Sequence, residues 1–272
     1  MSQLLITCVA ENTKEFHFRV LTLFHTIIHF GGELSSAKFV ANFVERVDVD
    51  IQEQLEHMGV HVKIVKPYRA KLQRHCNKIR MLELDEDYEV LLALDCDTAV
   101  TRDFTSEIDA YRFRRCDSLL DPLRIDEWKY LYNFYSLPIP DDEKKIHANS
   151  AVLFIPKKHV TKLRDAWLDY AHRITDTFFT NEQRSVFGRH KYYTDQFALS
   201  LALADQQIES DLLPAEFHIH INGKYQSWAD QLHPYILSYH HNVTTDWKLQ
   251  TTGMAIPDQY IHKVNNSLTF QL

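Results

Sequence analysis

The stretch from Val90 to Val100, VLLALDCDTAV, places five apolar residues directly before two aspartates, Asp95 and Asp97. A short, continuous apolar run is typical of a strand that is buried on both faces of a parallel sheet. A buried carboxylate without a partner is costly, so both side chains must be neutralised, hydrogen-bonded or bound to a metal. The stretch therefore predicts a buried strand, and it raises the question of which of these three the carboxylates at its end have.

Composition limits the class of protein. The chain has 272 residues, which suits one large domain or two small ones and allows a sizeable core. The net charge is −7, which argues against a nucleic-acid-binding surface, because contact with a phosphate backbone needs a basic face. The charge therefore favours no nucleic-acid partner. No window reaches about 18 consecutive apolar residues, so we expect no transmembrane segment.

The spacing of the cysteines indicates in which kind of cellular compartment the protein folds. Cys8, Cys76, Cys96 and Cys116 are widely spaced and form no C-x-x-C pair, which favours free thiols in a reducing environment. The opening run MSQLLITCVA is apolar but short, with no basic residue before it, and is more typical of a first strand than of a signal peptide. A cytoplasmic location is therefore expected.

Strands and helices alternate in the first part of the chain. Apolar runs predict strands at 4–9, 37–44, 60–65 and 90–94, and helical spacing predicts helices at 14–30, 50–58 and 75–84. This order predicts a mostly parallel sheet with helices on both faces, in which ligands bind beyond the carboxyl ends of the strands. Later strands are expected at 148–157, 208–214 and 234–241, and helices at 159–173 and 192–204. The segment after Thr251 is polar and loosely patterned, and no linker divides the chain.

The spacing of Asp95 and Asp97 suits a cation. Residues two apart on a strand point the same way, so at a strand end both carboxylates could converge on one ion. Mn²⁺ and Mg²⁺ favour carboxylate oxygens and often share their ligand shell with substrate phosphates. D-x-D alone is common in surface turns. Its position directly after VLLAL, in a chain with this alternation of elements, favours the functional interpretation.

Several segments together resemble one family. YEVLLALDCDTAVTRDF (88–104) is similar to the D-x-D segment of GT-A-fold glycosyltransferases related to glycogenin and the bacterial lipopolysaccharide galactosyltransferases. NKIRMLEL lies upstream of it, and ANSAVLFIPK and YTDQFALSLAL lie downstream, in the family's order. The resemblance implies an α/β GT-A fold: a mostly parallel nucleotide-diphosphate-binding sheet flanked by helices, with a smaller mixed sheet on the acceptor side. It also implies a single catalytic domain at 1–250, with a nucleotide-sugar half at 1–104, an acceptor half at 105–250 and a tail at 251–272.

The resemblance also implies roles for individual residues. Metal ligands are expected at Asp95 and Asp97, and donor contacts at Lys78 and Cys96. The residues implied to position the sugar and the acceptor are Asn149, Asp195 and Gln196. Near the end of the first strand, topology alone places Ala10 and Asn12 beside the nucleotide.

The chain departs from the family pattern at the late metal-binding histidine. Ser238 stands in that slot, while His240 and His241 follow it. Either the ligand role has moved to His240, or this chain does without that ligand. His240 is favoured because of its place in the closing strand, whereas His241 would point the other way if the strand continued. Ala151 also stands where glycine is usual.

These observations predict a glycosyltransferase that depends on Mn²⁺ or Mg²⁺. The expected donor is a nucleotide diphosphate sugar, with UDP favoured, and the acceptor is a hydroxyl of a carbohydrate, lipid or protein. Retention of configuration at the transferred hexose is implied by the resemblance only. One alternative is a sugar-1-phosphate nucleotidyltransferase, although CVAENTKEF lacks the glycine-rich loop of those enzymes. The other is a sugar- or partner-binding module without turnover.

Overall fold

The computed structural model describes residues 3–68, 72–118, 121–179, 186–222, 227–270 and 272. A seven-stranded sheet forms its centre, in the order β3–β2–β1–β4–β7–β6–β8. The strands are β1 (Leu4–Glu11), β2 (Lys38–Val44), β3 (Val60–Val65), β4 (Val90–Leu94), β6 (Phe113–Arg115), β7 (Val152–Pro156) and β8 (Ser210–Leu212). The four strands from β3 to β4 are parallel to one another, whereas β7 runs antiparallel to both of its neighbours. The predicted mostly parallel sheet is confirmed.

A second, smaller sheet has three strands in the order β5–β10–β9. They are β5 (Thr98–Val100), β9 (Ile219–His220) and β10 (Ile236–Ser238). The β5–β10 pair is antiparallel and the β10–β9 pair is parallel, so this sheet is mixed, as predicted. Only three residues separate β4 from β5, so the D-x-D segment connects the two sheets.

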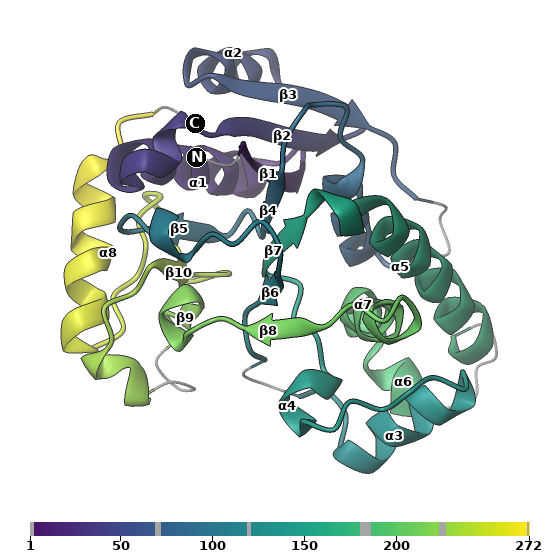
Figure 1. Ribbon diagram of the computed structural model, residues 1–272. Coiled ribbons are helices and arrows are strands. Elements are labelled where there is room, and N and C mark those ends of the chain that lie inside the picture. The colour runs from purple at the N-terminus through teal and green to yellow at the C-terminus, as the bar shows by residue number, and fades with distance from the viewer. Residues whose placement is uncertain (1–2, 69–71, 119–120, 180–185, 223–226, 271) are drawn as a thin grey trace.

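Helices surround both sheets (Figure 1). The α-helices are α1 (Lys14–Phe30), α2 (Val49–His57), α3 (Ile125–Phe134), α4 (Glu143–Ile146), α5 (Lys157–Phe178), α6 (Val186–Arg189), α7 (Thr194–Asp205) and α8 (Ala255–Ser267). The 3₁₀ segments are η1 (Gly32–Ser36), η2 (Arg74–Leu82), η3 (Thr105–Glu107), η4 (Lys191–Tyr193), η5 (Ala215–Phe217) and η6 (Ser227–Gln231). The helix expected at 14–30 matches α1, while the segment expected to be helical at 75–84 is the 3₁₀ segment η2.

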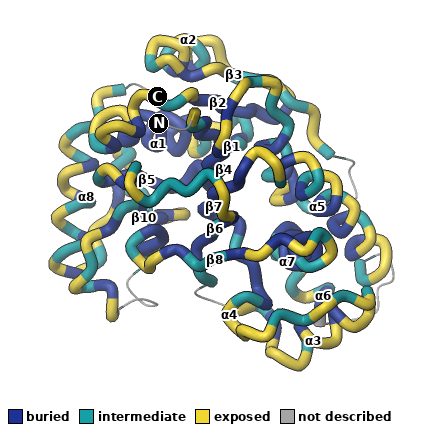
Figure 2. Tube along the Cα trace, viewed as in Figure 1, coloured by how far each residue is buried: buried dark blue, intermediate teal, exposed yellow. Residues whose placement is uncertain are grey.

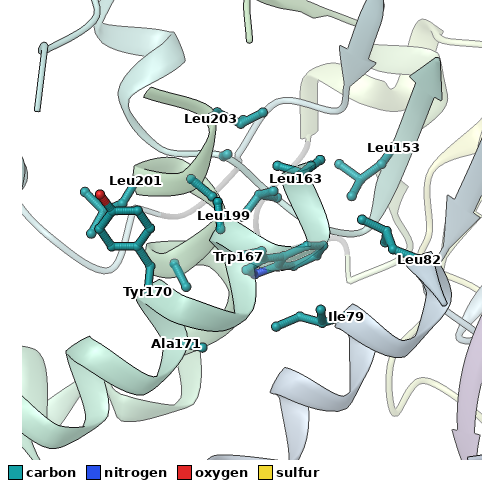
Figure 3. Packing of buried hydrophobic residues seen from close by; sticks show 14 of the residues in the cluster. Ile79, Leu82, Leu153, Leu163, Trp167, Tyr170, Ala171, Leu199, Leu201 and Leu203 are labelled. Carbon is teal, nitrogen blue, oxygen red and sulfur yellow. The ribbon is translucent and has the colours of Figure 1, made fainter. Parts of the chain in front are cut away.

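The central strand β4 is apolar throughout because it has a core on each face. Leu91 and Ala93 face one buried cluster, and Val90, Leu92 and Leu94 face the other. Figure 3 shows the first cluster, in which side chains of η2, β7, α5 and α7 pack around Trp167. Figure 2 shows the buried strands at the centre and the exposed outer faces of the helices.

The segment after Thr251 forms the helix α8, for which the sequence offered only a weak pattern. Asp258 accepts hydrogen bonds from the backbone N–H groups of Thr252 (2.7 Å) and Gly253 (2.9 Å), which fixes the entry to the helix. Ile261 and Val264 are fully buried in a third cluster, which also holds residues of β5, β9 and β10. The helix therefore covers the small sheet (Figure 1).

Two further features concern the whole chain. All four cysteines are buried and none forms a disulfide, in agreement with the expected free thiols. No helix in the described part of the chain is long and apolar enough to cross a membrane.

Candidate functional site

A cavity of about 720 Å³ opens beyond the carboxyl ends of β1 and β4. Its wall combines residues from α1, η2, α7 and the turn before β7 with residues of and next to the small sheet. This is the edge at which parallel α/β sheets bind ligands. The residues predicted from the sequence that line it are Ala10, Lys78, Asp95, Cys96, Asp97, Asn149, Asp195, Gln196 and His240.

Asp95 and Asp97 lie in the turn between the two sheets, not on a continuing strand. The strand β4 ends at Leu94 and β5 begins at Thr98. The two aspartates therefore do not converge for the predicted reason, which was that residues two apart on one strand point the same way. The turn is held by the Asp95 N–H, which donates to the Ala151 carbonyl (2.8 Å), and by the Tyr239 N–H, which donates to the Asp97 carbonyl (3.0 Å). Both aspartates line the cavity because the turn bends there.

Lys78 is the partner of Asp95. Its Nζ lies 2.7 Å from Asp95 Oδ2 and 3.8 Å from Asp195 Oδ2. Ser150 Oγ accepts from Lys78 (3.3 Å) and donates to Asp195 Oδ2 (2.9 Å), which links the three charged groups. Burial acts to lower the pKa of Lys78, but the two carboxylates outweigh it and raise that pKa above the ordinary value, so the ammonium group stays charged at neutral pH.

Burial raises the pKa of Asp95, although Lys78 opposes this shift. Burial also acts to raise the pKa of Asp97, but the hydrogen bond and charge of His240, with the positive charge of Arg19, hold it well below the ordinary value. The two carboxylates therefore differ: Asp97 is firmly ionised, while Asp95 depends on its lysine partner.

His240 is the partner of Asp97. Its Nδ1 lies 3.1 Å from Asp97 Oδ2. The residue has a positive φ of 45°, which turns the chain just after β10. Arg19 on α1 donates to the His240 carbonyl (3.0 Å) and so anchors the turn. His241 also lines the cavity, but it contacts Glu15 and not Asp97: its Nδ1 lies 3.0 Å from Glu15 Oε1, and its side chain is 86% exposed.

The remaining predicted residues fall into two groups. Asn149 lines the cavity, and its Oδ1 accepts from the Ala151 N–H (2.9 Å) in the turn before β7. Cys96 and Ala10 are buried in the cavity wall. Asn12 does not line the cavity: its amide contacts Asp48 (2.8 Å) and His17 (2.8 Å), which joins the end of β1 to the start of α2.

Sequence reasoning did not identify several residues of the site. Gln196 Oε1 lies 2.7 Å from His147 Nε2, and His147 Nδ1 lies 2.5 Å from Asp121. Ser150 joins Lys78 to Asp195, and Arg19 anchors the turn at His240. The sequence carried no signal for these contacts, because each joins positions far apart in the chain.

Metal-binding residue types are present, but they are not assembled around an ion. In the described part of the chain, no three His, Cys, Asp or Glu side chains are placed so that they could hold a metal together. The Asp97–His240 pair does suit one: ligands about 2.0–2.1 Å from an octahedral ion and at right angles lie roughly 3 Å apart. The 3.1 Å between Asp97 Oδ2 and His240 Nδ1 meets that requirement.

Comparisons with known proteins agree with the fold. Residues 35–207 match the Rhodobacterales glycosyltransferase domain family, a range that includes Lys78, the D-x-D turn and Asp195 but ends before His240. No curated protein is significantly similar to the chain in sequence.

Solved structures of glycosyltransferases share the architecture. The galactosyltransferase LgtC, solved with donor and acceptor sugar analogues, is 13% identical with a TM-score of 0.64, over 98% of this chain and 97% of that one. GlyE of Streptococcus pneumoniae TIGR4 is 15% identical with a TM-score of 0.59, over 99% of this chain and 61% of that one. Mouse xyloside xylosyltransferase 1 is 10% identical with a TM-score of 0.51, over 89% and 98%. The predicted GT-A fold is thereby confirmed.

Proposed function

Because this chain belongs to the Rhodobacterales glycosyltransferase domain family, we propose that it transfers a hexose from a nucleotide diphosphate sugar, with UDP as the nucleotide, to an acceptor hydroxyl. The observation that carries the proposal is the convergence of the D-x-D turn, Lys78 and Asp195 in one cavity at the carboxyl edge of the sheet. We include retention of configuration in the proposal because the sequence resembles the glycogenin and lipopolysaccharide galactosyltransferase family.

The proposal includes a divalent cation, Mn²⁺ or Mg²⁺. Asp97 and His240 would hold it, and Asp95 would add its second oxygen while Oδ2 stays with Lys78. When bound, such an ion neutralises the diphosphate and stabilises the charge of the departing nucleotide.

The remaining groups act on the sugar and the phosphates. The ammonium group of Lys78 is charged, and its contacts with Asp95 and Asp195 hold it in place. It would therefore offer a fixed positive charge to the leaving phosphate. Asp195 is held by Lys78 and Ser150, which leaves it placed to accept hydrogen bonds from sugar hydroxyls. Gln196 and Asn149 supply neutral polar groups to the same cavity.

The test is nucleotide release from a panel of donors. Purified protein is incubated with UDP-glucose, UDP-galactose, UDP-N-acetylglucosamine and GDP-mannose, with and without Mn²⁺, and released UDP or GDP is measured. We expect one UDP-sugar to be hydrolysed slowly even without an acceptor, and only with the metal. No release from any donor under either condition would favour a binding module without turnover.

Thermal stability supplies a second measurement. UDP with Mn²⁺ should raise the melting temperature, because a ligand that binds only the folded state stabilises it. Asp97→Asn should abolish the part of the shift that depends on metal. Asp50→Asn on the exposed face of α2 is the matched control and should keep it. An Asp97→Asn protein with an unchanged metal-dependent shift would contradict the metal assignment.

A further inference from the structure

A chain of hydrogen bonds connects the cavity wall to the surface of the protein. Gln196 lines the cavity, and its Oε1 lies 2.7 Å from His147 Nε2. On the other side of the ring, His147 Nδ1 lies 2.5 Å from Asp121 Oδ1. The His147 side chain is 4% exposed, whereas that of Asp121 is 57% exposed. The chain therefore runs from solvent, through a buried imidazole, to an amide in the candidate site.

The ring of His147 is held firmly in relation to Gln196. Its centroid lies 5.0 Å from that of the buried indole of Trp128, and the planes are 31° apart. The backbone beside it is also tied to α7, because the Ala148 N–H donates to Ser200 Oγ (2.8 Å). Ser200 Oγ in turn donates to the Gln196 carbonyl (2.8 Å). The distance between the imidazole and the start of α7 is thus fixed by the main chain as well as by the side chains.

Such a partner matters for a glutamine at a cavity wall. The side-chain amide has two unlike ends, a carbonyl oxygen that accepts and an amino group that donates. An amide without a partner could turn over and would meet a sugar hydroxyl with either end. Because His147 engages the Oε1 end of Gln196, the amino end is left for the cavity. Fixing the side chain before the substrate binds also avoids the loss of rotamer freedom at that moment.

We propose that His147, held in turn by Asp121, is a positioning residue that fixes the Gln196 amide for contact with the transferred sugar. This inference rests on the proposed function, in which Gln196 contacts the sugar. His147 is not among the residues that line the cavity, so it would act through Gln196 and not on the substrate. The Asp121 carboxylate accepts from Nδ1–H and so sets the orientation of the ring, as groups behind a functional histidine commonly do.

The first test separates kcat from KM. Nucleotide release from the UDP-sugar that the protein hydrolyses is measured with His147→Phe, which keeps a ring beside Trp128 but loses both hydrogen bonds. We expect kcat to fall roughly 10- to 100-fold, as when a group at the reacting centre is misplaced. The KM for the donor should change less than about threefold, because the nucleotide is held by other residues. His147→Gln, whose amide nitrogen can take the place of Nε2, should recover most of the loss.

Asp121 supplies a second variant with a matched control. Asp121→Asn weakens the hold on the ring and should lower kcat in the same direction as His147→Phe, but by less, because the bond to Gln196 remains. Asp126→Asn removes a carboxylate that is also exposed and contacts Arg124 (3.1 Å). This control should leave kcat and KM unchanged.

A double-mutant cycle distinguishes positioning from a general structural role. In a Gln196→Ala protein the group to be positioned is gone, so adding His147→Phe should lower kcat no further. If His147 served only to stabilise the fold, its effect would be the same with and without the Gln196 side chain, and the two losses would multiply.

The results that would overturn the inference are distinct from a failure of the proposed function. If the unmodified protein releases nucleotide and His147→Phe keeps its kcat, or if the losses in the cycle multiply, the role of His147 is wrong while the transferase stands. If the unmodified protein releases no nucleotide from any donor, the proposed function fails, and the positioning role of His147 fails with it.

Discussion

At the scale of single residues, the site is a set of ion pairs between distant segments. Lys78 on η2 joins Asp95 in the turn to Asp195 at the start of α7, and His240 joins Asp97 to the end of the small sheet. Each buried carboxylate thus has a positive or polar partner, which answers the energetic problem that the apolar run before Asp95 posed.

Lys78→Met should impair both catalysis and stability. Nucleotide release should fall roughly 100-fold, as expected when one preorganised charge at a transition state is removed. Loss of the ammonium group also leaves two carboxylates without their partner, which should cost about 3 kcal/mol of unfolding free energy at neutral pH. Lys158→Met, on the exposed face of α5, is the control that should change neither.

The stability loss in Lys78→Met should shrink in acid. The pKa of Asp95 is already raised by burial, and without the lysine it should rise further. A carboxyl whose folded pKa lies above its unfolded value destabilises the fold when ionised, and protonation relieves the cost. Urea unfolding at about pH 7 and about pH 5 should therefore show a smaller difference from the unmodified protein at the lower pH. An equal loss at both values would contradict this origin.

His25 on α1 should make stability depend on pH. Burial, and then the neighbouring His29, lowers its pKa below the ordinary value, so the unfolded chain binds a proton more readily than the folded one. This contribution is complete above the ordinary histidine pKa of about 6.5 and is lost as the pH falls from there through the lowered pKa of the folded state. Urea midpoints should decline between about pH 7.5 and about pH 5.5, and less so in His25→Gln. The exposed His57→Gln should decline like the unmodified protein.

At the scale of elements, the small sheet positions Asp97 and His240, and α8 packs against the face of that sheet opposite the cavity. The strand β10 leads directly to His240, and β5 follows directly from Asp97, so both members of this pair depend on where the sheet lies. Helix α8 covers the opposite face of that sheet with two fully buried side chains. The helix therefore contributes to the site without contacting the cavity.

Ile261→Ala should test that contribution. Removing a fully buried isoleucine side chain should cost about 3 kcal/mol of unfolding free energy, from lost transfer energy and the cavity left behind. Affinity for Mn²⁺ with UDP should also weaken, because the strand before His240 loses its support. His262→Ala, on the exposed side of the same helix, should leave both the urea midpoint and the metal affinity unchanged. Equal effects of the two substitutions would argue against the covering role of α8.

At the scale of the whole molecule, the two halves inferred from the sequence share one core. Strand β7, from the second half, pairs with β4 from the first along five registered positions. Both large buried clusters draw residues from both halves. The division at residue 104 stays a prediction about function, with nucleotide contacts in one part and acceptor contacts in the other.

The shared core leads us to expect a single cooperative unfolding transition. Fluorescence reports on Trp167, buried beside α7, and on Trp247, which packs near the small sheet, while far-ultraviolet circular dichroism reports on all the helices. The two signals should change at the same urea concentration, as expected for two-state unfolding. Separate transitions would show that the small sheet and α8 unfold on their own.

Local chemistry determined much of this protein from the sequence alone. The apolar runs fixed the parallel strands, helical spacing fixed α1, and the aspartates after β4 marked the ligand-binding edge. Only the tertiary structure decided which partners those aspartates have. Lys78 and His240 reach the cavity through a 3₁₀ segment and a left-handed turn, and neither of these has a reliable signature in local sequence. The spacing of apolar residues within one segment indicates which face of that segment is buried. A site, in contrast, is built from contacts between segments that come together only when the chain folds.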